Sequence, residues 1–119
     1  GELKYTKSHE WVDYIEDKKV RIGLTEYAVE ELGDLVFIDL PEVDDEVEIE
    51  DPFADVESVK AVSEVFSPVS GVITAVNEDL LDHPELVNEN PLEAWFIEVS
   101  EITEEEDMIT KDEYDEFVS

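Results

Sequence analysis

The sequence contains no cysteine, which excludes a disulfide framework, a thiolate metal site and a cysteine nucleophile. Its four glycines, at positions 1, 23, 33 and 71, cannot form the glycine-rich loops that hold dinucleotides or nucleotide phosphates. Two histidines without a Ser-His-Asp arrangement give little basis for nucleophilic catalysis. No apolar run approaches the roughly 20 residues of a membrane span, and the first residues lack the apolar stretch of a signal peptide. We therefore expect a cytoplasmic protein.

Basic side chains are scarce as well: 7 Lys and Arg face 36 Asp and Glu, which gives a formal net charge of −29. Such a surface repels nucleic-acid phosphates and anionic lipid headgroups, so we expect neither nucleic acid nor membrane as a partner. The acid excess can serve solubility, attract basic proteins or mimic a nucleic acid. Because any acidic pair is expected by chance in such a chain, an enzyme that uses carboxylates as acid and base is the least favoured function.

The remaining composition predicts a folded chain built mostly from strands. Leu, Ile, Val and Phe make up about a third of the 119 residues, above the roughly 20% below which charged chains stay disordered. Sixteen valines against five alanines favour strands over helices. The length suits one domain, and no linker divides the chain, so we expect residues 1–119 to form a single unit.

Local patterns place the elements. Thr25 as N-cap and Gly33 as the stop predict a short helix over 26–32. Two capping boxes, Thr103 with Glu106 and Thr110 with Glu113, predict a helical C-terminal segment over about 103–117. The apolar run at 35–40 is typical of a buried strand. Other strands are expected in a hairpin over 10–15 and 19–24, half-exposed within 42–52, and at 72–76 and 94–99; a turn is expected at 67–71 and a short helical or irregular connection at 83–91.

Lys60 is the only basic residue between positions 22 and 110, a stretch that contains 27 acidic residues. Apolar tracts at 53–59 and 61–66 flank it and favour a hairpin with Lys60 near its tip. An exposed lysine at such a tip is open to an enzyme that forms an amide on its amine. This is typical of a group carrier, which needs no catalytic side chain of its own. The alternative is that Lys60 merely offsets neighbouring charge.

The sequence resembles the H proteins of the glycine cleavage system. The resemblance covers essentially the whole chain, from LKYTKSHEWV (3–12) to AWFIEV (94–99) and the acidic segment that follows. Its most specific parts are GD-x-VF-x-x-LPE (33–42), ESVKA (57–61) and SPVSG (67–71). The resemblance implies a barrel-sandwich hybrid of two small antiparallel sheets with short helices, including C-terminal ones, related to lipoyl and biotinyl domains. It also implies that lipoate is attached to Lys60 in amide linkage.

The family's partners follow from the same resemblance. The P protein (glycine decarboxylase) transfers the aminomethyl group left from glycine to the lipoyl arm, and the T protein (aminomethyltransferase) releases ammonia and passes on the one-carbon unit. The L protein (dihydrolipoamide dehydrogenase) reoxidises the dihydrolipoyl group, and a lipoate ligase or lipoyltransferase attaches it. The resemblance thus implies a non-catalytic carrier without a metal, which we expect to be a monomer.

The resemblance also assigns binding residues. Ser8, Glu10 and Glu64 correspond to polar residues of a cleft that shelters the loaded arm from water, where carboxylates would stabilise a cationic amine. The alternative is that the two glutamates are plain solvated side chains. The lipoylating enzyme should recognise the residues that flank the lysine, although strand packing is an alternative role for Val59: Glu57, Ser58, Val59 and Ala61. The chain departs from the family at Glu31, a histidine in some members, and at Ala94, often glycine.

Two other functions remain open. An H-like lipoate carrier could serve another lipoate-dependent system, which reconstitution with the P, T and L proteins would reveal. An acidic protein that mimics a nucleic acid would need no particular lysine. One lipoyl mass increment that disappears in Lys60→Arg favours the carrier, whereas an unmodified protein that binds a basic nuclease favours the mimic.

Overall fold

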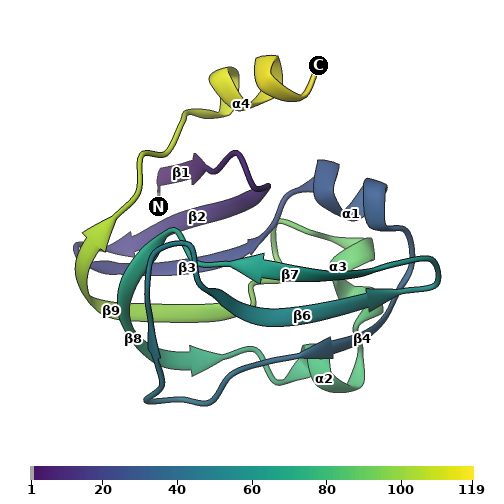
Figure 1. Ribbon diagram of the computed structural model, residues 1–119, viewed down its shortest axis with the longest axis horizontal. Helices are drawn as coiled ribbons and strands as arrows, with labels where there is room; N and C mark the ends of the chain where they lie inside the picture. The colour runs from purple at the N-terminus through teal and green to yellow at the C-terminus, as the bar shows by residue number, and fades with distance from the viewer. Residues whose placement is uncertain (1) are drawn as a thin grey trace.

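The computed structural model describes residues 2–119, which form two antiparallel sheets and short helices (Figure 1). The larger sheet has the strand order β1-β2-β3-β9-β8-β5, and the smaller has the order β4-β6-β7. The strands of the larger sheet are β1 (Glu2–Tyr5), β2 (Glu10–Glu16), β3 (Lys19–Leu24), β5 (Glu46–Val47), β8 (Val69–Val76) and β9 (Ile97–Glu105). The smaller sheet contains β4 (Leu35–Asp39), β6 (Pro52–Ser58) and β7 (Val62–Phe66). The helices are α1 (Glu26–Leu32), α2 (Asp79–Asp82), α3 (Glu85–Glu89) and α4 (Lys111–Val118).

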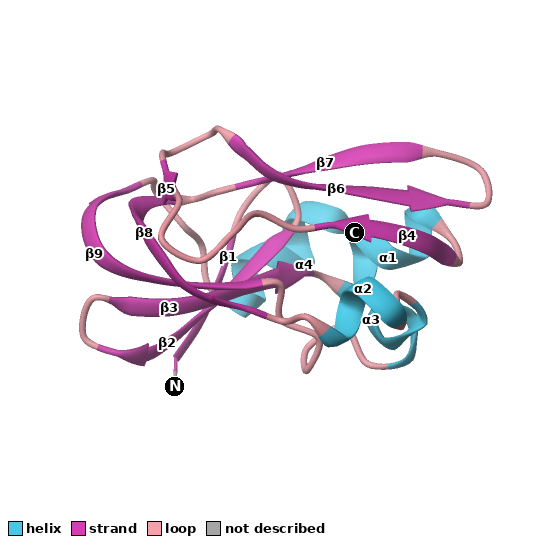
Figure 2. Cartoon of the chain, turned by 90° about the horizontal axis from the view of Figure 1, so that it is seen from below, coloured by secondary structure: helices cyan, strands magenta, loops and turns pink. Residues whose placement is uncertain are grey.

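This architecture confirms the predicted mainly β fold of two small sheets with short helices, one of them C-terminal. The sheets are not closed into a barrel, and helices α1, α2 and α3 lie together at one end of the strands (Figure 2). In the described part of the chain, no helix is both long and apolar enough to span a membrane.

The core follows the apolar positions of both sheets. Ile22, Ile38, Ile73 and Phe96 are at most 1% exposed, and each such side chain contributes about 1.5–3 kcal/mol on burial. A second, smaller cluster of Tyr5, Trp11 and Tyr114 packs β1 and β2 against α4. The main core lies between the layers, while the second cluster holds the C-terminal helix in place.

Helix α1 begins and ends as the sequence predicts. The Thr25 hydroxyl accepts a hydrogen bond from the backbone N–H of Ala28 at 3.2 Å, which caps the first turn. Gly33 ends the helix with φ 87° and ψ −162°, and its N–H donates to the Val29 carbonyl at 3.0 Å. The hairpin of β2 and β3 and the short helical connection at α3 are confirmed as well.

The predicted half-exposed strand within 42–52 is wrong for most of its length. Only Glu46 and Val47 pair with a neighbour, and Pro52 already begins β6. Asp44 and Glu50 have φ values of 79° and 68°, and left-handed residues interrupt an extended chain. The alternating pattern therefore belongs to two turns with a short bridge between them.

The predicted helical segment over about 103–117 is wrong in its first part. Strand β9 continues to Glu105, which pairs with Val69, because the ladder to β8 offers more hydrogen bonds than one isolated helical turn. The second capping box is confirmed: the Thr110 hydroxyl accepts from the Glu113 N–H at 3.2 Å, and the Glu113 carboxylate accepts from the Thr110 N–H at 2.9 Å. The helix begins at Lys111.

Other boundaries also differ from the sequence patterns. Strands β1 and β8 include residues that the patterns left outside strands, since β8 begins at Val69 inside the predicted turn. The last strand begins at Ile97 rather than at 94. Helix α2 was not predicted, because four residues give too short a periodic pattern.

Candidate functional site

The hairpin of β6 and β7 carries Lys60 at its tip and projects from one end of the molecule (Figures 1 and 2). The last strand pair joins Glu57 to Val62, and the Ser58 N–H donates to the Ala61 carbonyl at 2.8 Å. The Ser58 hydroxyl accepts from the N–H groups of Lys60 at 3.2 Å and Ala61 at 3.0 Å. A serine hydroxyl thus fixes the turn, so the tight Asn-Gly type of turn is not needed. The predicted position of Lys60 is confirmed.

The Lys60 side chain is exposed and lies over the C-terminal end of α1. Its Cε is 3.5 Å from the place where a Cβ on Gly33 would lie. The N–H of Val59 donates to the Asp34 carbonyl at 3.1 Å, which ties the tip to the turn between α1 and β4. Within residues 2–119, the Lys60 amine forms no hydrogen bond or ion pair. The backbone of the tip is therefore held against the end of α1, while the exposed Lys60 side chain extends over Gly33.

Gly33 provides a test of this arrangement. We expect Gly33→Ala to lower the free energy of unfolding by about 1–3 kcal/mol, because its φ of 87° with ψ of −162° is a conformation that only glycine adopts without strain. Urea unfolding measures the loss. The exposed α1 residue Glu30 supplies the control, since Glu30→Ala should change stability by about 0.5 kcal/mol or less. A Gly33→Ala variant as stable as this control would contradict the expectation.

A cavity of about 270 Å³ lies between β7 and α1. The residues that line the cavity include Leu32, which precedes Gly33, the residue over which the Lys60 side chain lies. The charged groups of the lining are Glu31 and Glu64, with no lysine or arginine among the lining residues. The lining consists of Ser8, His9, Leu24, Tyr27, Ala28, Glu31, Leu32, Val56, Ser63, Glu64 and Val65. An acidic, partly apolar cavity of this kind favours a cationic group on an apolar stem.

Ser8 and Glu64 line this cavity, whereas Glu10 is not among the lining residues. Its side chain is 1% exposed, so the alternative that it is a plain solvated glutamate is wrong. One carboxylate oxygen, Oε1, accepts hydrogen bonds from Ser8 at 2.6 Å and Thr6 at 2.7 Å. Burial raises the pKa of Glu10 to about 7, although the hydrogen bonds from Ser8, Thr6 and the Phe66 backbone oppose this rise. Glu10 contacts the cavity through Ser8.

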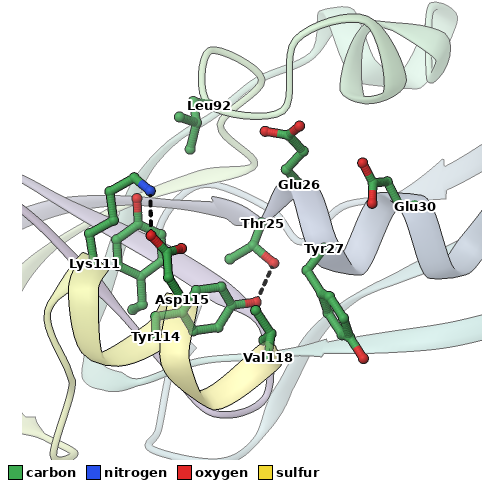
Figure 3. A pocket seen from close by; sticks show the side chains of 10 residues that line it. Thr25, Glu26, Tyr27, Glu30, Leu92, Lys111, Tyr114, Asp115 and Val118 are labelled. Carbon is green, nitrogen blue, oxygen red and sulfur yellow. Dashed lines mark hydrogen bonds and ion pairs between the residues drawn. The ribbon is translucent and has the colours of Figure 1, made fainter.

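His9, which also lines the cavity, forms a polar contact with the C-terminal helix. Its Nδ1 lies 2.8 Å from the Tyr114 hydroxyl. That hydroxyl is also 2.7 Å from the Thr25 hydroxyl (Figure 3). Burial lowers the pKa of His9. These bonds join α4 to the cap of α1. In residues 2–119, no group of three or more His, Asp and Glu side chains is arranged to hold a metal ion.

The residues beside the lysine are placed as follows. Ser58 forms the turn, Ala61 is exposed and Glu57 is half-buried. Val59 is 71% exposed, so the alternative that it packs inside the strand layers is wrong. Of the two family departures, Glu31 lines the cavity, and Ala94 is buried in the connection between α3 and β9.

Beside the site, the exposure of strand β4 differs from what the sequence pattern indicates. The run at 35–40 predicts a buried strand, and Leu35 and Ile38 are buried, but Phe37 is 49% exposed, and Val36 next to it is 56% exposed. A continuous apolar run cannot show which of its side chains faces water. The only available signal was its position in the specific motif of residues 33–42.

Comparisons with known proteins agree with this geometry. The family model described as "Glycine cleavage H-protein" matches residues 3–119. A "Glycine cleavage system H protein" from Halalkalibacterium halodurans is 55% identical, covering 100% of this chain and 94% of the relative, and one from Lachnoclostridium phytofermentans is 52% identical, covering 98% and 91%. The crystal structure of a glycine cleavage system H protein from Mycobacterium marinum superposes with a TM-score of 0.88 at 38% identity, covering 96% of this chain and 94% of that one.

Proposed function

The chain belongs to the glycine cleavage H-protein family, and we propose on this basis that it is a lipoate carrier with Lys60 as its attachment residue. The observation that supports the proposal most directly is the accessible Lys60 amine at a hairpin tip, beside an acidic cavity. The residues present fit the group, because the amine has no competing partner within residues 2–119 and the adjoining cavity is partly apolar.

Lipoate in amide linkage supplies a disulfide that accepts the aminomethyl group derived from glycine. The chain itself would provide position and shelter. The tip presents Lys60 to the P, T and L proteins in turn, at the raised effective concentration that a tether gives. The chain contributes no catalytic side chain in this proposal, and residues 1–119 act as one carrier domain.

The cavity would hold the arm between visits. Glu64 and Glu31 face it, and Ser8 links it to the buried Glu10. A cationic amine at this place gains charge-assisted hydrogen bonds, and the apolar lining keeps bulk water away from it. Glu57, Ser58, Val59 and Ala61 would form the recognition segment for the lipoate ligase or lipoyltransferase.

Reconstitution tests the proposal. The lipoylated protein, combined with the P, T and L proteins, tetrahydrofolate and glycine, should support glycine-dependent turnover, and the unlipoylated protein should not. A lipoylated protein that supports none would instead serve another lipoate-dependent system. A protein that accepts no lipoate but binds a basic nuclease would instead be a nucleic-acid mimic.

A further inference from the structure

We propose that the outer face of the β4-β6-β7 sheet is the docking surface for the enzyme that acylates Lys60, an inference that rests on the proposed function. Phe37 pairs with Glu57, and Glu57 pairs with Val62. Directly paired residues point to the same face of a sheet. The paired large apolar side chains on this face are therefore Phe37, 49% exposed, and Val62, 69% exposed, and the unpaired Val36 beside Phe37 is 56% exposed. Together with Val59 they form what we name the tip patch.

The tip patch is a cluster of exposed apolar side chains next to Lys60. Val59 and Val62 lie within two residues of Lys60, and Phe37 is in register with the Lys60 hairpin through Glu57. Each of the three apolar side chains is about half exposed or more. Clustered exposed apolar groups with a polar rim mark interaction sites. Aromatic residues such as Phe37 are enriched in the centres of interfaces.

The next row of the same face is acidic. Asp39 pairs with Asp55, and Asp55 pairs with Glu64, so three exposed carboxylates form one row, in which Glu64, on the edge strand β7, also lines the cavity. Like charges directly opposite each other destabilise a sheet. None of the three forms an ion pair with another residue of the described chain. The complementary partner is a protein whose apolar pocket has lysine or arginine on one side.

The chemistry of acylation identifies which partner this is. The unprotonated Lys60 amine attacks the carbonyl carbon of an acyl adenylate; the C–N bond forms, the C–O bond to phosphate breaks, adenylate leaves and the nitrogen releases a proton. The reacting atom is the lysine nitrogen itself, so this enzyme must close around the hairpin tip. An enzyme that acts on the loaded arm reacts at its far end, several bonds from the tip patch. The patch therefore fits the acylating enzyme.

Phe37→Ser tests the inference. With lipoate, ATP and a lipoate ligase, intact mass followed over time gives kcat/KM for acylation, which we expect to fall about tenfold, as for a central interface residue. Leu81 on α2 is 50% exposed, so Leu81→Ser removes a similarly exposed apolar side chain elsewhere and should leave the rate unchanged. Val62→Ser repeats the test if Phe37→Ser lowers the urea midpoint.

Two further measurements make the result decisive. Asp39→Asn with Asp55→Asn should lower kcat/KM and weaken its dependence on salt, because rim charges act mainly on association. Once fully acylated at high ligase concentration, Phe37→Ser should be reduced at the wild-type rate by dihydrolipoamide dehydrogenase run in reverse, with NADH as the electron donor. Acylation of Phe37→Ser and Val62→Ser at the wild-type kcat/KM overturns the inference, as does an equal loss in Leu81→Ser. A wild-type protein that is not acylated at all overturns the proposed function instead.

Discussion

The Lys60→Arg variant is expected to accept no lipoyl group, while its stability stays unchanged. A guanidinium stays protonated at all accessible pH values and delocalises its charge, so it cannot attack an acyl adenylate as an amine does. The positive charge is retained at an exposed position without an ion-pair partner in residues 2–119. The free energy of unfolding should therefore change by no more than about 0.5 kcal/mol.

Intact mass after incubation with lipoate, ATP and lipoate ligase provides the measurement. The wild-type protein should gain one lipoyl increment and Lys60→Arg none. Lys111→Arg is the control, because Lys111 is also exposed but is held by Asp115 at 2.8 Å on α4 (Figure 3). An increment on Lys60→Arg, or its loss in Lys111→Arg, would place the attachment residue elsewhere.

Loss of the increment should abolish glycine-dependent turnover completely. A tethered carrier has no partial substitute for its attachment point, so Lys60→Arg should fall to the background of the unlipoylated wild type. A nucleic-acid mimic would behave differently, since it acts through a net charge that Lys60→Arg leaves at −29. Binding to a basic nuclease is thus insensitive to this substitution, and the two functions separate on one variant.

Short-range chemistry explains what the sequence could predict. The cap of α1 at Thr25 and its end at Gly33 depend on groups within a few residues, and both are confirmed. The same holds for the turn at Lys60, which apolar tracts on both sides make a hairpin tip. These features carry the site, because the end of α1 and the hairpin tip lie against each other through Gly33 and Lys60.

Long-range pairing explains which features could not be predicted from the sequence. Thr103 and Glu106 form a proper capping pattern, yet Thr103 lies within strand β9, whose residues Glu104 and Glu105 pair with β8 across the sheet. Exposure is equally non-local: Phe37 faces water although Ile38, beside it in the same apolar run, is 1% exposed. The reverse occurs at Glu10, an acid inside the protein. Both faces of β2 are covered, since Trp11 packs in the second cluster and Val12 in the main core. Residue type alone does not indicate a carboxylate buried there.

Glu10 leads to the second large effect, a pH-dependent stability. Its pKa is about 7 in the folded chain against 4.5 without burial. Below pH 4.5 both states hold the proton; between 4.5 and 7 the unfolded chain releases it first, so stability falls as pH rises. Above the folded pKa the loss is complete, about 3 kcal/mol in all at 1.36 kcal/mol per pKa unit.

Glu10→Gln isolates this contribution from the other acids of the chain. Urea unfolding of both proteins from pH 4 to pH 8 should show the variant gaining about 3 kcal/mol relative to the wild type. Any constant cost from the amide, which faces the donors Thr6 and Ser8, cancels in this comparison. Glu64→Gln, at an exposed carboxylate of the cavity, serves as the control and should show no such change. A flat difference for Glu10→Gln would mean that Glu10 ionises normally despite its burial.

If the proposed function is correct, loading the carrier should change this pH dependence of the stability. A cationic amine held in the cavity next to Ser8 would favour the ionised form of Glu10 and lower its pKa. In the loaded carrier, the free energy of unfolding should then stop falling at a lower pH, and its total loss should be smaller. Since the buried charge has found its counter-ion, the loaded protein should be more stable at pH 8 than the unloaded one. An equal pH profile in both states would show that the amine does not reach Ser8.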